Sequence, residues 1–215
     1  MHNTILLVPG FHGSGPAHWQ SWMEQCIPGA RRVGGIDWAR PVLALWAGEV
    51  RREIDQAPGA VWLVAHSFGC LASVIAATDR PAKVAGLLLV ASAEPRRFSL
   101  FGRRDEYPGG GNVASALPAG PLNSPSLLVA SRNDPWLDFV HAGELADRWG
   151  SRLVDAGEAG HINTDSGHGA WPQGLDLLAG LQLASAGFPL GAIDGGGRCG
   201  ALARLRRQTR ANMGA

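Results

Sequence analysis

One stretch decides how this chain folds: Val61-Trp62-Leu63-Val64-Ala65-His66-Ser67-Phe68-Gly69-Cys70. Its first half is a continuous apolar run, which is typical of a strand buried on both faces of a parallel sheet. The run leads into a small-x-Ser-x-Gly turn, and residues 71–77 then have the composition of a helix. A strand, a sharp turn that carries a serine and a helix are the context that a nucleophile elbow requires. The sequence therefore predicts that the Ser67 hydroxyl is presented above the end of a strand.

The residues around Ser67 suit such a turn. Gly69 and Ala65 are small, as they must be where strand and helix approach closely, and alanine in place of glycine at 65 adds only one methyl group. The turn also aims backbone N–H groups toward an oxyanion, and the Phe68 N–H is the first expected donor. The second donor should come from the glycine-rich loop at residues 8–15, where Phe11 is the first choice and His12 the second.

Apolar runs and helical patterns alternate along most of the chain. The expected strands are Ile5–Val8, Arg31–Gly34, Val61–Ala65, Val84–Ala91, Ser126–Ser131 and Arg152–Asp155. The expected helices are Ala17–Cys26, Pro41–Gln56, Phe68–Thr78, Trp136–Trp149 and Trp171–Leu183. This order predicts an α/β domain with a mostly parallel central sheet of about six strands and helices on both faces.

Two segments interrupt this alternation. Residues 94–124 contain three consecutive glycines and few periodic apolar positions, so we expect a long loop or a minimal lid there. We expect residues 1–185 to form the domain and residues 186–215 to be a Gly/Arg-rich extension, disordered or loosely docked. The pattern Gly195-x-Gly197-x-x-Gly200 follows no strand, so it does not indicate a dinucleotide site, and no cofactor is expected.

Composition excludes several classes of protein. The 215 residues carry a formal net charge of +1, which gives no reason to expect nucleic acid as a partner. The apolar runs are too short to cross a bilayer, and no basic region precedes the first one, so we expect a cytoplasmic protein that does not bind membranes. The three cysteines have no regular spacing, and the seven histidines show no ligand pattern, so neither a disulfide framework nor a metal site is expected.

Three residues have the types and the chain order of a catalytic triad. A serine hydroxyl needs a base within hydrogen-bond reach, and the base needs an acid that orients it. On an elbow of this kind the order should be Ser, then Asp, then His. Asp134 follows the fifth apolar run, and His161 lies in a glycine-containing loop after the sixth. Because the carboxyl ends of parallel strands meet at one edge of a sheet, we expect Ser67, Asp134 and His161 to lie together.

Other residues compete for these roles. Asp138 lies one helical turn beyond Asp134 and is the alternative acid, although a solvated helix residue is the simpler interpretation. His66 lies inside the elbow, but its side chain should point away from Ser67, which favours packing. Trp19, Trp136 and His12 are the expected pocket residues, together with Phe11 and Phe68, while some of the eight tryptophans are expected in the core.

These motifs together resemble those of a known family. The chain looks like the small serine hydrolases of the α/β-hydrolase superfamily that are related to retinoblastoma-binding protein 9. The resemblance covers about residues 4–183 and is carried by Pro9-Gly10, His18-Trp19-Gln20, Ala65-His66-Ser67-Phe68-Gly69-Cys70, Ser131-Arg132-Asn133-Asp134-Pro135-Trp136, Gly160-His161-Ile162-Asn163, Ser166-Gly167 and Trp171-Pro172. It implies a compact α/β-hydrolase fold with almost no lid, and Ser67, Asp134 and His161 as the triad.

The resemblance implies a serine hydrolase with esterase-like activity. We expect small acyl esters or thioesters as substrates, through an acyl-enzyme on Ser67. The alternatives are a weakly active or non-catalytic binding module on the same scaffold, and an acyltransferase or amidase that uses the same triad. The Leu-x-Cys-x-Glu segment linked to retinoblastoma protein in some relatives does not occur here, so that partner is not expected.

Overall fold

A computed structural model describes residues 3–187 of the chain. The strands are β1 (Thr4–Val8), β2 (Arg31–Arg32), β3 (Val61–His66), β4 (Val84–Val90), β5 (Phe98–Ser99), β6 (Gly102–Arg103), β7 (Ser126–Ala130) and β8 (Arg152–Asp155). The helices are α1 (Trp19–Cys26), α2 (Leu43–Gln56), α3 (Phe68–Asp79), α4 (Val113–Ala116), α5 (Phe139–Trp149) and α6 (Pro172–Ser185), with short 3₁₀ turns η1 (Pro95–Arg97) and η2 (Thr164–Ser166).

Six strands form one parallel sheet in the order β2-β1-β3-β4-β7-β8. Every residue of β1, β3 and β7 is buried, as a strand covered on both faces requires, whereas the edge strand β8 is partly exposed. The prediction of a mostly parallel sheet of about six strands is therefore confirmed.

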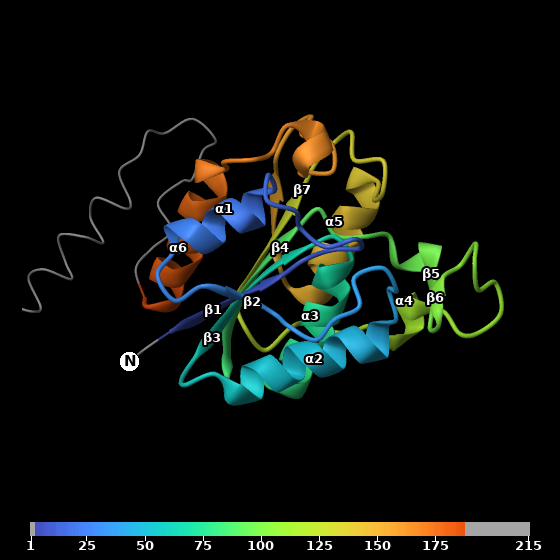
Figure 1. The fold of residues 1–215 in the computed structure, drawn as a ribbon, viewed down its shortest axis with the longest axis horizontal. Coiled ribbons are helices and arrows are strands. Elements are labelled where there is room, and N and C mark those ends of the chain that lie inside the picture. Colours follow the sequence, from blue (N-terminus) through green and yellow to red (C-terminus); the bar gives the residue numbers. More distant parts are fainter. Residues whose placement is uncertain (1–2, 188–215) are drawn as a thin grey trace, which may run out of the picture.

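Helices cover both faces of the sheet (Figure 1). On one face, α2, α3 and α5 enclose a core that contains Trp46, Leu71 and Trp149. On the other face, α1 and α6 pack over a second core around Trp19 and Leu178. Alternate residues of the strands supply the two cores, which is why the strand sequences are apolar throughout rather than alternating.

The strand order reverses direction between β1 and β3. From β1 the chain first adds β2 on one side, and every later strand is added on the other side. In open parallel sheets, ligands bind outside the carboxyl ends of the strands at such a switch point. The turn at Ser67 ends β3, and the loop at Gly10 follows β1, so both lie at this point.

Several helices begin one to three residues later than predicted, and in two of them a side chain caps the new start. Helix α1 begins at Trp19 rather than Ala17, since His18 Nδ1 accepts a hydrogen bond from the Gln20 N–H. Helix α5 begins at Phe139 rather than Trp136, since Asp138 accepts one from the Val140 N–H. Asp138 is therefore a helix cap, which is the common use of an aspartate at this position.

Residues 94–124 are not a plain loop. They contain η1, the antiparallel pair β5–β6 and the single-turn α4. This cap segment lies beyond the carboxyl ends of the strands (Figure 1), and its elements have two to four residues each. The predicted extension at 186–215 lies almost entirely outside the described residues. In residues 3–187, no helix is long and apolar enough to cross a membrane.

Candidate active site

Ser67 adopts a backbone conformation that few residues other than glycine adopt, with φ +53° and ψ −124°. The turn is possible because Gly69 has no side chain: a Cβ there would lie 2.4 Å from the Pro9 carbonyl oxygen and 2.5 Å from that of Val8. Strained backbone of this kind persists only where the surrounding structure holds it, and it is concentrated at functional sites. The turn sets the Ser67 hydroxyl at the end of β3.

The structure brings Ser67, His161 and Asp134 together in one chain of hydrogen bonds. The Ser67 Oγ lies 2.9 Å from His161 Nε2, and His161 Nδ1 lies 2.9 Å and 3.0 Å from the two carboxylate oxygens of Asp134. An ionised carboxylate only accepts, so Nδ1 carries the proton and Nε2 is free to accept from the hydroxyl. The side chains of His161 and Asp134 are 8% and 2% exposed.

Asp134 is held by its own turn. One of its oxygens also accepts a hydrogen bond from the Trp136 N–H at 2.9 Å. Pro135 between them disfavours a helical conformation for Asp134. Asp138, the alternative acid, instead caps α5, so it is Asp134 that faces the imidazole.

The loop that carries His161 is held from the Asp134 side by two side chains. The Ser131 hydroxyl accepts a hydrogen bond from the Ala159 N–H at 2.9 Å, and the Asn133 side-chain oxygen accepts one from the Gly160 N–H at 2.7 Å. Ser131 also donates to Asn133 at 2.8 Å. The two loops are thus tied together next to the contact between His161 and Asp134.

Two further side chains hold the same loop from the other direction. Trp19 Nε1 donates to the Ile162 carbonyl oxygen at 2.8 Å, and His66 Nε2 lies 2.9 Å from the His161 carbonyl oxygen. Trp19 is fully buried, so its expected place in the pocket is wrong: its indole packs in the core and fixes the loop. His66 does pack, as predicted, but its hydrogen bond to the loop was missed, because the partner lies 95 residues away in the chain.

The loop after β1, which carries one of the expected oxyanion donors, comes close to Ser67. Gly10 comes shortly after β1 and lies against the turn at Ser67: a Cβ on Gly10 would lie 2.6 Å from the Ser67 Cβ. His12, the second choice, donates its N–H to the Trp38 carbonyl oxygen at 2.8 Å and is not available. Phe11 and Phe68 stay the predicted donors, with Phe68 at the N-terminus of α3, where backbone N–H groups lack helical partners.

The close approach of Gly10 predicts a strong effect of one added methyl group. Gly10→Ala should lower kcat/KM for a small ester by about 10- to 100-fold, because displacing a reacting group by about 1 Å has a cost of that order. Gly15→Ala is the matched control, since a Cβ there meets nothing within 4 Å, and it should leave the kinetics unchanged. Steady-state kinetics of both variants check this, and equal kinetics for Gly10→Ala and wild type would contradict it.

Aromatic and basic side chains surround the site. Trp136 is 42% exposed and its ring centroid lies 6.1 Å from that of His161, so it stays a candidate for the pocket. From the cap segment, the Arg97 guanidinium lies 5.2 Å from the Trp136 ring and that of Arg103 lies 5.9 Å from the Phe11 ring. The cap segment therefore places a guanidinium close to each of these two aromatic rings. His12 is exposed and stacks on Phe11, with ring centroids 3.8 Å apart.

Burial changes the acidity of three groups near the site. Burial, helped by the Arg32 guanidinium, lowers the pKa of His18 to about 4. Burial also holds the pKa of His66 well below its ordinary value, and the neighbouring His161 adds to this effect. Both rings are therefore neutral near pH 7. Burial raises the pKa of the Cys70 thiol, so the thiol stays protonated and Cys70 acts as a packing residue.

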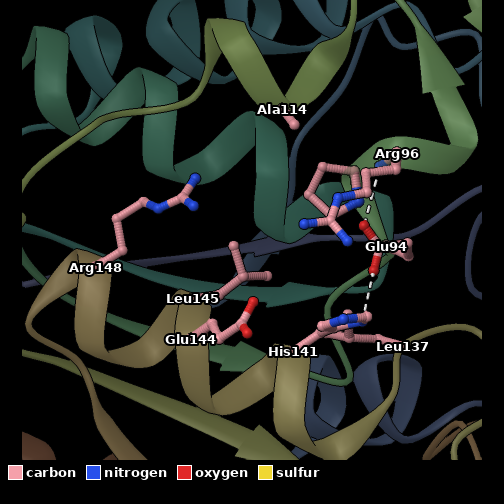
Figure 2. A pocket seen from close by; sticks show the side chains of 9 residues that line it. Glu94, Arg96, Ala114, Leu137, His141, Glu144, Leu145 and Arg148 are labelled. Atoms are coloured by element: carbon pink, nitrogen blue, oxygen red, sulfur yellow. Dashed lines mark hydrogen bonds and ion pairs between the residues drawn. The ribbon is translucent and has the colours of Figure 1, made fainter.

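A separate pocket lies between the cap segment and α5 (Figure 2). Glu94 lies on one side of it, between Arg96 and His141: its carboxylate accepts from the Arg96 N–H at 3.0 Å and pairs with His141 at 3.3 Å. Arg148 and Glu144 of α5 complete the charged lining. Ser67, His161 and Asp134 are not among the residues that line it. In residues 3–187, no group of His, Cys, Asp and Glu side chains is placed to hold a metal ion.

Comparison with known proteins identifies the family. The sequence model of the serine hydrolase family matches residues 5–180. A YdeN-like hydrolase from Pectobacterium atrosepticum is 37% identical, with a TM-score of 0.75 and coverage of 87% of this chain and 94% of that one. Two more distant structures share the fold. The ydeN gene product of B. subtilis is 19% identical, with a TM-score of 0.65 and coverage of 84% of this chain and 99% of that one. An α/β hydrolase enzyme from a lagoon-sediment metagenome is 14% identical, with a TM-score of 0.60 and coverage of 87% and 93%. No curated protein matches the chain. The match over most of the chain and the 37% identity show that the protein belongs to the serine hydrolase family and has the α/β-hydrolase fold.

Proposed function

We propose that the protein is a serine hydrolase that cleaves small acyl esters or thioesters through an acyl-enzyme. The observation that carries this proposal is the unbroken chain of hydrogen bonds from Ser67 through His161 to Asp134. All three residues follow strands at the carboxyl edge of the sheet, where substrates of such folds bind.

In the proposed mechanism Ser67 Oγ attacks the ester carbonyl carbon while His161 Nε2 takes the hydroxyl proton. Asp134 accepts the hydrogen bond from His161 Nδ1, which keeps the imidazole in the correct tautomer and stabilises its positive charge. The Phe11 and Phe68 N–H groups stabilise the oxyanion. The imidazolium then gives the proton to the leaving alkoxide or thiolate. Water, deprotonated by His161, releases the acid and restores Ser67.

The size of the cap segment supports small substrates. Its strands have two residues each and its helix has four, so little material is present to enclose a long acyl chain. The exposed Trp136 and the partly exposed Phe11 supply apolar surface beside Ser67. We extend the proposal to a cytoplasmic enzyme with small-molecule substrates and no nucleic-acid or membrane partner.

Covalent labelling with a fluorophosphonate tests the proposal directly. The wild-type protein should take one equivalent of the probe, because the probe reacts with serines that are activated by a neighbouring base. Intact mass gives the stoichiometry, and peptide mapping should place the added mass on Ser67. A panel of acetyl to octanoyl esters and the corresponding thioesters then ranks acyl length. A well-folded wild type that takes no label and hydrolyses none of the panel would favour the non-catalytic binding module.

A further inference from the structure

One buried histidine beside the site has no part in the mechanism above. His66 directly precedes Ser67, is 5% exposed, and has its ring centroid 4.9 Å from that of His161. Its Nε2 lies 2.9 Å from the His161 carbonyl oxygen. Because a carbonyl oxygen can only accept, Nε2 carries the proton and donates it. His161 is thus held at two points: Ser67 contacts its side chain, and His66 binds its main-chain carbonyl.

The main chain at His161 needs such support. Gly160 and Ile162, on either side of it, have φ values of +59° and +46°. A left-handed conformation is unfavourable for a β-branched residue such as Ile162 and persists only where neighbouring groups enforce it. The carbonyl groups of His161 and Ile162 are held by His66 and Trp19 respectively. Of these two bonds, the one from His66 acts on the residue that carries the imidazole.

We propose that His66 is a positioning residue, whose Nε2–H bond to the His161 carbonyl holds the imidazole where it reaches Ser67 and Asp134 at once. The inference rests on the proposed function, since the position of His161 matters to turnover only if it is the base. His66 is also suited to this place by its charge: burial keeps its pKa well below the ordinary value, so the ring is neutral when the adjacent His161 takes a proton.

The loss of this bond should affect turnover more than substrate binding. The His161 carbonyl would be left buried without its donor, and the loop would relax to satisfy it. A displacement of the imidazole by about 1 Å lengthens both of its hydrogen bonds and lowers the rate by about 10²-fold. The groups proposed to contact the acyl chain, such as Trp136, do not depend on this bond, so KM should change little.

Three substitutions at His66 separate positioning from packing. His66→Met fills much of the same volume but has no donor, and should lower kcat by about 10- to 100-fold with little change in KM. His66→Gln places an amide N–H close to the position of Nε2 and should recover most of kcat. The shorter side chain of His66→Asn places its amide nearer the position of Nδ1, where it cannot reach the carbonyl, so this variant should behave like His66→Met. If His66→Met does not fold, the comparison of His66→Gln with His66→Asn still tests the positioning role.

Val64→Ala controls for simple destabilisation. Val64 is fully buried on β3, two residues before His66, and belongs to the same core as Trp19. The substitution should lower Tm while leaving kcat of the folded enzyme unchanged.

A second readout is the downfield proton resonance of the His161 Nδ1–H that is bound to Asp134. This resonance should persist in wild type, His66→Gln and Val64→Ala. It should shift or broaden in His66→Met and His66→Asn.

The outcomes are distinct. Suppose that the wild type is active and that the Met or Asn variant keeps both wild-type kcat and an unchanged resonance. This result would overturn the positioning role of His66 and leave the proposed function intact. The same conclusion follows if Gln, Met and Asn lose kcat equally while the resonance is unchanged. A wild type that neither takes the fluorophosphonate nor hydrolyses any ester would overturn the proposed function, and the positioning role with it.

Discussion

Ser67→Ala is expected to lower kcat for a small ester by about 10⁶-fold, because removal of the nucleophile from a Ser-His-Asp site costs about as much as removal of the whole set. The variant should also take no fluorophosphonate. KM should stay similar, since the apolar surface of Trp136 and the amides of Phe11 and Phe68 are unaffected. Residual hydrolysis should come only from water held near the oxyanion donors. Steady-state kinetics and intact mass on the same preparations check both expectations.

Ser73→Ala is the matched control for Ser67→Ala. Ser73 lies on the same helix α3, is fully buried, and its hydroxyl has no hydrogen-bond partner among the described residues. Its loss should leave kcat and labelling unchanged, and should alter stability little. Sites of this kind keep far less than about a hundredth of wild-type turnover without their serine. If Ser67→Ala kept more than that, Ser67 would not be the nucleophile and the acyl-enzyme mechanism would be wrong.

The arrangement of the sheet could be predicted because local sequence determines it. Residues 61–65 form a continuous apolar run, the residues at 65 and 69 on either side of Ser67 are small, and the next residues suit a helix. Each of these features acts over fewer than ten residues, so no knowledge of distant contacts is needed. The places of Asp134 and His161 follow from the sheet, because parallel strands put their carboxyl ends at one edge. The contact distances among the three side chains are then a consequence of the fold.

The supports of the site could not be predicted in the same way. Trp19 binds the Ile162 carbonyl across 143 residues of sequence, and His66 binds the His161 carbonyl across 95. Nothing near Trp19 in the sequence indicates that its indole N–H faces a distant loop rather than a substrate. A tryptophan beside a glycine-rich loop suits both roles, and burial alone distinguishes them. The short helices and strands within the cap segment could not be predicted for another reason: elements of two to four residues leave no periodic pattern to detect.

Asp134→Asn is expected to lower kcat by about 10⁴-fold with the fold intact, because the neutral amide leaves the imidazole in the wrong tautomer. Asp134 accepts from His161 Nδ1–H through both oxygens. An asparagine presents an N–H to Nδ1, which favours the proton on Nε2, and Nε2 then cannot accept from the Ser67 hydroxyl. The loss should be largest near neutral pH and smaller in alkaline solution, where hydroxide can take over the role of the base.

Asp138→Asn separates the two candidate acids. Asp138 caps α5 by accepting from the Val140 N–H, and asparagine is an equally good cap, so this variant should keep wild-type kcat and Tm. The opposite result, a large loss with Asp138→Asn and a small one with Asp134→Asn, would assign the acid to Asp138 and require the Asp134 loop to move before turnover. Equal and small losses in both variants would mean that the imidazole needs no carboxylate, and that the loop contacts from Ser131, Asn133 and His66 suffice to orient it.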